Sequence, residues 1–170
     1  MVESKQNKFL IVNCTDCTIF TRGAVERKEV NIAMKGILLL SHGTLCQGMI
    51  SALEVIGFTA EQVKAVPLFM DSELGAYTQS VSEAIDELDT GEGVLVITDL
   101  LGGTPFNRSC ELLATKHIAL IAGMSMPMCV TALDLRDSET LESLAEQCVQ
   151  EGRGGALNAL SLMEEQTREI

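Results

Sequence analysis

The chain has few of the residue types that bind nucleic acids or anionic membranes. Its 170 residues include no Trp and one Tyr, and 12 Lys and Arg residues against 24 Asp and Glu residues give a formal net charge of −12. Nucleic acids and anionic lipids attract basic surfaces, and single strands also stack on aromatic side chains. The composition therefore argues against nucleic acid and membrane partners, and it is compatible with a basic protein partner.

Long hydrophobic runs are also lacking. None approaches the ~18 residues of a membrane span, and the run 9–12 is too short for a secretory signal. The cysteines are scattered, which indicates reduced thiols rather than a disulfide framework. They are Cys14, Cys17, Cys46, Cys110, Cys129 and Cys148. Cys14 and Cys17 have no second pair or well-spaced His, so no metal site is predicted. We expect a cytoplasmic protein without metal, cofactor or membrane insertion.

The first 33 residues differ from the rest of the chain because they show no sustained helical or strand period. Lys28-Glu29-Val30 can be encoded by a bacterial ribosome-binding sequence, at a suitable distance before the codon of Met34. We expect residues 1–33 to be a non-native or unstructured leader and residues 34–170 to be one domain. A genuine flexible extension remains the alternative.

From Met34 onward, short apolar runs alternate with amphipathic stretches. Expected strands are 36–40, 63–69, 93–98 and 118–122, and expected helices are 44–56, 74–88, 105–116, 128–135 and 141–150. This alternation predicts an α/β fold, a mainly parallel sheet with helices on both faces in a three-layer sandwich. Pro67 places its strand near an edge, Gly57 is expected to end its helix, and the glycine-rich stretch 152–155 is expected to interrupt the last helix.

Chemistry in such sheets collects at the carboxyl ends of the strands. His42 and Gly43 follow the first expected strand, and Asp99 follows the third. A carboxylate on Nδ1 of His42 would leave Nε2 free as a nucleophile and would stabilise the ring as it becomes positively charged. His117 precedes a strand instead, so we expect it to lie at the opposite end as a structural or surface residue.

The loop after Asp99 contains Gly102, Gly103, Thr104 and Pro105. The glycines allow close backbone approach, and Thr104 and Pro105 suit the N-cap and first helical position. Amides at such a helix start favour an anion, although a well-capped turn would also explain Thr104 and Pro105. There is no Walker loop and no G-x-G-x-x-G fingerprint. We infer that these amides hold the oxygens of a phosphoryl group on His42. Because no nucleotide-binding motif is present, the donor of that group is expected to be a molecule other than ATP.

Three segments carry a resemblance to a known family: residues 36–43 ending in SHG, GVLVITDLLGGTPFN at 93–107, and IALIAGMSMPM at 118–128. They resemble the IIA components of mannose-family (mannose, fructose and sorbose) phosphoenolpyruvate-dependent sugar phosphotransferase systems. The resemblance implies that His42 accepts a phosphoryl group on Nε2 from the phosphocarrier protein HPr. It implies transfer onward to a histidine of a IIB component, which serves the membrane components IIC and IID.

Within this resemblance, Asp99 matches the carboxylate paired with the active histidine, and Thr104 matches a small hydroxyl residue near the phosphate. It also implies a homodimer with a strand exchanged near the C-terminus. The alternatives are the phosphocarrier subunit of dihydroxyacetone kinase and, from another class, a flavodoxin-type small-ligand module. The latter would need a phosphate loop and aromatic residues after the first strand, and residues 36–44 offer neither.

Overall fold

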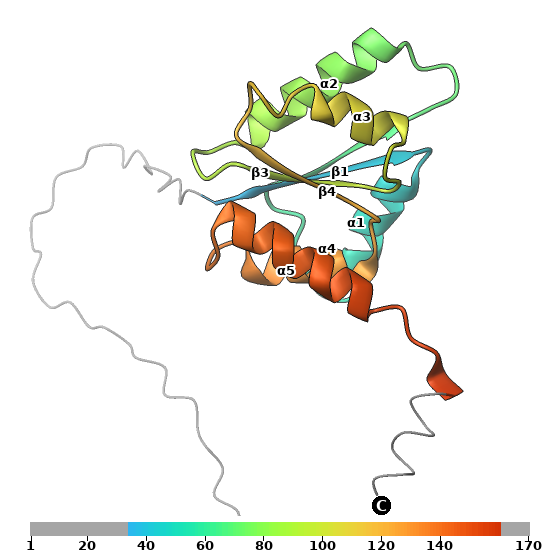
Figure 1. The fold of residues 1–170 in the computed structure, drawn as a ribbon, viewed down its shortest axis with the longest axis vertical. Coiled ribbons are helices and arrows are strands. Elements are labelled where there is room, and N and C mark those ends of the chain that lie inside the picture. The colour runs from blue at the N-terminus through green and yellow to red at the C-terminus, as the bar shows by residue number, and fades with distance from the viewer. Residues whose placement is uncertain (1–33, 161–170) are drawn as a thin grey trace, which may run out of the picture. The chain divides into compact units, whose positions relative to one another are not determined.

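The computed structural model describes residues 34–160, in which four strands form one sheet (Figure 1). The strands are β1 (Gly36–His42), β2 (Val63–Leu68), β3 (Val94–Thr98) and β4 (Ile118–Ala122). All neighbours pair in parallel, in the order β2-β1-β3-β4. The predicted parallel α/β fold is confirmed. The leader predicted at residues 1–33 lies outside the described residues.

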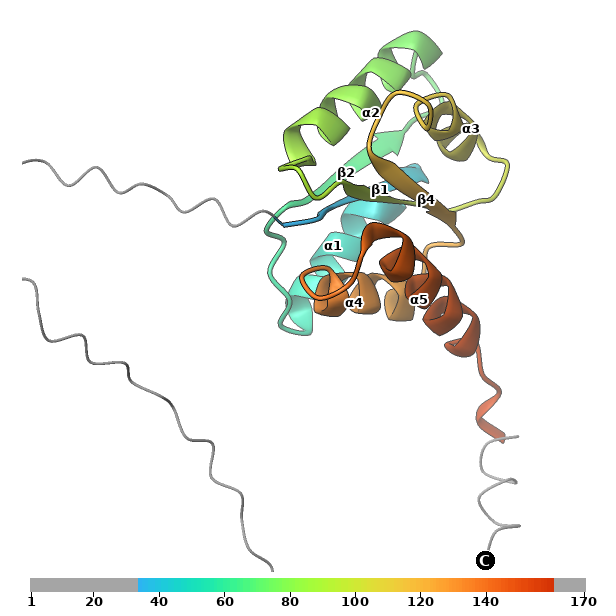
Figure 2. The ribbon, with the colours of Figure 1, turned by 60° about the vertical axis from the view of Figure 1, so that its left-hand side comes forward.

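Five helices cover the two faces of this sheet. They are α1 (Leu45–Val55), α2 (Leu74–Leu88), α3 (Thr104–Cys110), α4 (Met126–Leu135) and α5 (Leu141–Gly154). Helices α2 and α3 lie on one face, and α1, α4 and α5 lie on the other (Figures 1 and 2). None of the helices described within 34–160 is long and apolar enough to cross a membrane.

The strand residues divide alternately between two hydrophobic cores. Ile37 and Leu39 of β1 pack with α1, α4 and α5, whereas Leu38 and Leu40 pack with α2. Side chains of successive strand residues point to opposite faces, so a sheet covered on both sides needs continuous apolar runs. Each fully buried leucine stabilises the fold by roughly 1.5–3 kcal/mol. The central strands are therefore rigid supports for the residues that follow them.

Pro67 and Gly57 lie where the sequence predicts. Pro67 belongs to β2, which is an edge strand, so its missing N–H costs no ladder bond on the outer side. Gly57 follows α1 with φ +98°, and the next N–H, of Phe58, donates to Leu53 O at 3.1 Å. A glycine adopts this left-handed conformation without strain and closes the helix.

Two helix predictions are wrong at their ends. Helix α3 ends at Cys110 rather than Lys116, because the chain continues in tighter turns such as Leu112 N–H to Ser109 O at 3.0 Å. Helix α5 runs through Gly152 instead of breaking there. A Cβ on Gly152 would lie 2.8 Å from Met128 Cε, and one on Gly155 would lie 2.4 Å from Pro127 Cγ. These glycines allow α5 to pack closely on α4, so tertiary contact outweighs low helix propensity.

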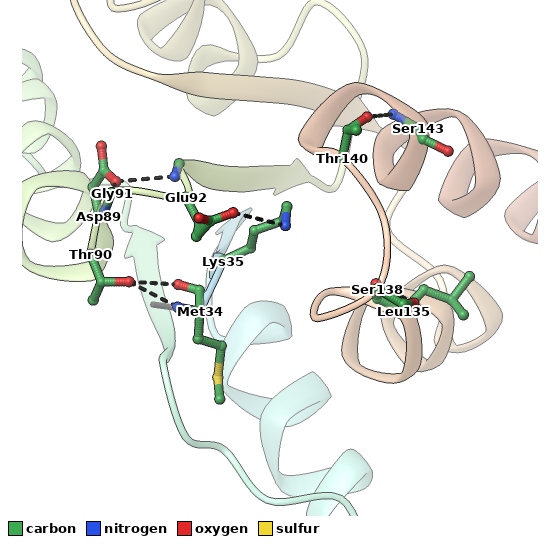
Figure 3. Close-up of polar contacts among 11 residues, drawn as sticks. Met34, Lys35, Asp89, Thr90, Gly91, Glu92, Leu135, Ser138, Thr140 and Ser143 are labelled. Atoms are coloured by element: carbon green, nitrogen blue, oxygen red, sulfur yellow. Dashed lines mark hydrogen bonds and ion pairs between the residues drawn. The ribbon is translucent and has the colours of Figure 1, made fainter. Parts of the chain in front are cut away.

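The amino end of the sheet is held by mutually paired polar groups (Figure 3). The Thr90 hydroxyl accepts from Met34 N–H at 3.0 Å and donates to Met34 O at 2.9 Å. Lys35, whose side chain is 8% exposed, contacts Glu92 at 3.4 Å. Asp89 accepts from the N–H groups of Gly91 and Gly93. These contacts join the start of β1 to the loop between α2 and β3.

Three of the described cysteines, Cys46, Cys129 and Cys148, are buried free thiols. Burial raises the pKa of Cys129 to about 12 and the pKa of Cys148 to about 11. A buried thiol with a raised pKa stays protonated and inert. These side chains therefore act as core residues. Met126 and Met128 also pack in that core, with Met124 beside them.

Candidate functional site

His42 is the last residue of β1, at the carboxyl end of the sheet. The preceding Ser41 is fully buried, and its hydroxyl donates to Gly43 O at 3.1 Å and accepts from Cys46 N–H at 2.9 Å. Gly43 has φ +56°, and its N–H donates to Leu68 O at 2.8 Å. This turn leads directly from β1 into α1. It fixes the backbone under His42 and leaves the imidazole side chain 46% exposed.

Asp99 reaches His42 from the adjacent strand. Its N–H donates to Leu40 O at 3.1 Å, which continues the pairing of β3 with β1 by one residue. One carboxylate oxygen, Oδ2, accepts from His42 N–H at 2.8 Å and lies 3.0 Å from His42 Nδ1. A carboxylate at this position favours the tautomer with the proton on Nδ1. Nε2 is then unprotonated, and the negative charge offsets any positive charge that the ring acquires.

The loop after Asp99 is shaped by Gly102 and Gly103. Gly102 has φ +76°, and its carbonyl accepts from the Asn107 side-chain amide at 2.9 Å. Gly103 lies against the imidazole, because a Cβ there would be 2.8 Å from His42 Cε1. The Asn107 N–H also donates to Gly103 O at 2.9 Å. Asn107 therefore fixes the loop, and the absence of a side chain at 103 leaves room for the ring.

The predicted cap of α3 is wrong by one residue. Gly103 is the N-cap, Thr104 is the first helical residue and Pro105 the second. Gly103 has the extended backbone of an N-cap residue, with ψ 167°. Thr104 is already helical, so its side chain does not cap the helix. Pro105 is buried and has no N–H to offer an anion. Its carbonyl accepts from the Ser109 hydroxyl at 2.8 Å, so it holds the helix in place.

A surface hollow of about 490 Å³ lies on the β2 side of His42. It is lined by His42, Gly43 and the connection from β2 to α2, with Leu68, Phe69, Met70, Ser72 and Leu74. Phe69, Met70 and Leu74 are exposed, as are Leu100 and Leu101 in the loop after Asp99. We call these five side chains the apolar rim. Exposed apolar groups gathered around a polar centre are typical of protein–protein contact surfaces.

Sequence reasoning found His42, Asp99 and the glycine loop but missed Ser41 and Asn107. Both residues lie inside the segments that carry the family resemblance, Ser41 in SHG and Asn107 in GGTPFN, so the motifs could have pointed to them. Their contacts with the backbone depend on turns, and hydrophobic periodicity does not predict turns. The apolar rim was also missed, since Phe69 was read as the end of a strand and Met70 belonged to no predicted element. His117 precedes β4 at the other end of the sheet, as predicted. Within residues 34–160 no group of His, Cys, Asp and Glu could hold a metal ion.

Fold and site together define a class: an α/β domain that presents a half-exposed histidine, paired with a carboxylate, at the carboxyl end of a parallel sheet. Comparison with known families gives a match over residues 36–149 to EIIA-man, described as the fructose IIA component of the phosphotransferase system (PTS). The chain belongs to this family of mannose-type IIA components. The resemblance inferred from the sequence is confirmed, and the flavodoxin-type alternative is set aside.

Named relatives agree with this assignment. The chain is 28% identical over 121 residues to the mannose-specific EIIAB component of the PTS from Escherichia coli K12, a match that covers 70% of this chain and 38% of that protein. It thus spans less than half the length of that relative. It is 32% identical over 93 residues to the sorbose-specific EIIA component from Lacticaseibacillus casei, with 54% and 67% covered.

Solved structures give the same result. The EIIA component from Streptococcus agalactiae superposes with a TM-score of 0.69 at 26% identity, covering 75% of this chain and 99% of that one. The mannose/sorbose IIA subunit from Enterococcus faecalis superposes with a TM-score of 0.66 at 22% identity, covering 74% and 94% of the two chains. The second likeness supports the fold alone.

Proposed function

We propose that this protein is a cytoplasmic phosphohistidine carrier, and the observation that carries the proposal is the Asp99 carboxylate on Nδ1 of a half-exposed His42. Nε2 of His42 attacks the phosphorus of phospho-HPr. The bond from phosphorus to Nε2 forms as the bond from phosphorus to HPr breaks. In the second step a histidine of a IIB component attacks, and the bond to Nε2 breaks. The sugar is then phosphorylated by way of the membrane components IIC and IID.

The loop residues have separate roles in this proposal. Gly103 brings backbone close to the ring and Gly102 shapes the turn before it, so N–H groups of this loop and of the start of α3 would receive phosphoryl oxygens. The hydroxyl of Thr104 completes this set, whereas Gly43, whose N–H donates to Leu68 O, turns the chain beneath His42. Pro105 contributes by holding the start of α3 rather than by donating a hydrogen bond. No metal or nucleotide takes part in either step.

The apolar rim supports docking of two partner proteins in turn. Its side chains lie on either side of His42, and an apolar surface excludes water when a partner covers it. Exclusion of water protects a reactive phosphohistidine from hydrolysis. The net charge of −12 favours basic partners and speeds their approach.

Incubation with phosphoenolpyruvate, enzyme I and HPr tests the proposal directly. We expect one acid-labile phosphoryl group per chain, lost in His42→Ala and retained in His117→Ala, the matched control at the other end of the sheet. Labelling that persists in His42→Ala would overturn the assignment. Transfer from the labelled protein to a dihydroxyacetone kinase subunit, and not to a IIB component, would support the alternative carrier.

We also propose that the protein is a homodimer with a strand exchanged between subunits. Strand β4 is an edge strand, and a groove lined by Ile121, Val149 and Arg153 runs beside it. The segment that follows α5 extends away from the domain (Figure 1), and its Leu157 and Leu160 are exposed. An unpaired edge beside an apolar groove is a template for another strand. Light scattering should give twice the chain mass, and a monomer mass at all concentrations would contradict the dimer.

A further inference from the structure

The carboxylate beside His42 has one oxygen that the site does not explain. Oδ2 of Asp99 accepts both N–H groups of His42, whereas Oδ1 is buried and has no hydrogen-bond partner among the described residues. An isolated buried carboxylate oxygen is costly, so such an atom in a native fold calls for an explanation. A donor on Oδ1 would also fix the rotation of the carboxylate, and with it the position of Oδ2 on His42.

Three other buried side-chain atoms in residues 34–160 lack a hydrogen-bond partner: Tyr77 Oη, Ser125 Oγ and Arg136 Nε. Arg136 donates from its guanidinium to Glu61 O at the start of β2, at the amino end of the sheet. Ser125 follows β4 and lies close to α5, since a Cβ on Gly152 would be 3.4 Å from its hydroxyl. Arg136 is therefore at the other end of the sheet from Asp99, and Ser125 follows β4, which lies on the opposite side of β3 from β1.

Tyr77 is on the first turn of α2, next to the segment that lines the hollow at His42. Its side chain belongs to the core formed by Leu38, Leu40 and Val96, directly under the carboxyl ends of β1 and β3, and the residue is 5% exposed. The titratable groups that act on its hydroxyl are Cys46 and Asp99. Burial is the main cause that raises the pKa of Tyr77, and Cys46 and Asp99 contribute in the same direction. The hydroxyl is therefore a neutral donor, and Tyr77 shares its core with Leu40, whose carbonyl accepts the Asp99 N–H.

We propose that Tyr77 is a positioning residue for the phosphoryl transfer, whose O–H donates a hydrogen bond to Oδ1 of Asp99 while Oδ2 holds His42. The proposal rests on the proposed carrier function. Among the described residues neither atom is paired, and one of them is a donor and the other an acceptor. The hydrogen bond would satisfy two buried polar groups at once and would leave the carboxylate with one orientation. Tyr77 touches neither the phosphoryl group nor the imidazole.

The composition of the chain supplies a direct optical test. Tyr77 is the only Tyr, and there is no Trp, so intrinsic fluorescence of the full-length protein comes from this phenol. A hydrogen bond to a carboxylate quenches tyrosine emission. We expect Asp99→Asn, which keeps the size and removes the charge, to emit more strongly than wild type. Equal emission of the two folded proteins would overturn the proposal.

A rate measurement completes the test. Tyr77→Phe should slow transfer from phospho-HPr roughly threefold to tenfold, the effect of one hydrogen bond. Ser125→Ala removes the other unpaired hydroxyl at this end and should leave both rate and fluorescence unchanged. A wild-type rate in Tyr77→Phe, or an equal loss in Ser125→Ala, would overturn the proposal. The fluorescence comparison needs no phosphoryl donor, so it stands even where His42 proves not to be phosphorylated.

Discussion

The two ends of the sheet use polar side chains for different purposes. At the amino end, Thr90 pairs with both backbone groups of Met34, and Lys35 pairs with Glu92. At the carboxyl end, His42 has one polar partner, Asp99, and its other face is open to solvent. The polar groups named at the amino end pair with one another or with the backbone. At the carboxyl end, Nδ1 of His42 pairs with Asp99, and Nε2 has no hydrogen-bond partner among the described residues.

The two histidines show the same contrast. His117 precedes β4, and its backbone carbonyl accepts from Val94 N–H, so it belongs to the sheet ladder. His42 ends β1 and is surrounded by exposed apolar side chains. A histidine becomes a candidate nucleophile when a carboxylate sets its tautomer and nothing covers its second nitrogen. Position in the fold decides which of the two histidines has that arrangement.

The largest effect should come from breaking the pair at the carboxyl end. Asp99→Asn keeps the side-chain volume, removes the charge and can favour the wrong tautomer of His42. A charge-assisted hydrogen bond contributes about 1.5–3 kcal/mol, which corresponds to roughly tenfold to hundredfold in rate at about 1.4 kcal/mol per decade. Stopped-flow transfer from phospho-HPr measures the rate, and circular dichroism checks that the fold is retained.

Asp89→Asn is the matched control for that change, because it removes the same charge at the amino end. Asp89 accepts from two glycine N–H groups, and an Asn side-chain oxygen can still accept them. We expect a transfer rate equal to wild type. If Asp89→Asn slowed transfer as much as Asp99→Asn, net charge rather than the Asp99–His42 contact would explain both results.

The sequence predicted the strands well, because a sheet covered on both faces requires continuous apolar runs such as 36–40 and 93–98. It also placed His42 and Asp99 on neighbouring strands, since parallel strands end at one edge. Helix ends were harder to predict. Gly152 lies inside α5 because its missing Cβ makes room for Met128, and that contact is long-range. The proposed role of Tyr77 could not be predicted from the sequence. Hydrophobic periodicity predicts that its side chain is buried, but it does not predict which charged group lies near the hydroxyl.

The smallest effect should come from the amino end, where the contacts serve stability alone. Thr90→Val keeps the shape but removes a hydroxyl that makes two hydrogen bonds with Met34. Each such bond contributes about 0.5–1.5 kcal/mol net, so the free energy of unfolding should fall by about 1–3 kcal/mol. Thr90→Ser retains the hydroxyl and should lose less. Urea unfolding of both variants measures this, and phosphoryl transfer by the folded Thr90→Val protein should match wild type. A slower transfer with unchanged stability would mean that the two ends of the sheet are coupled, and the division of roles between them would be wrong.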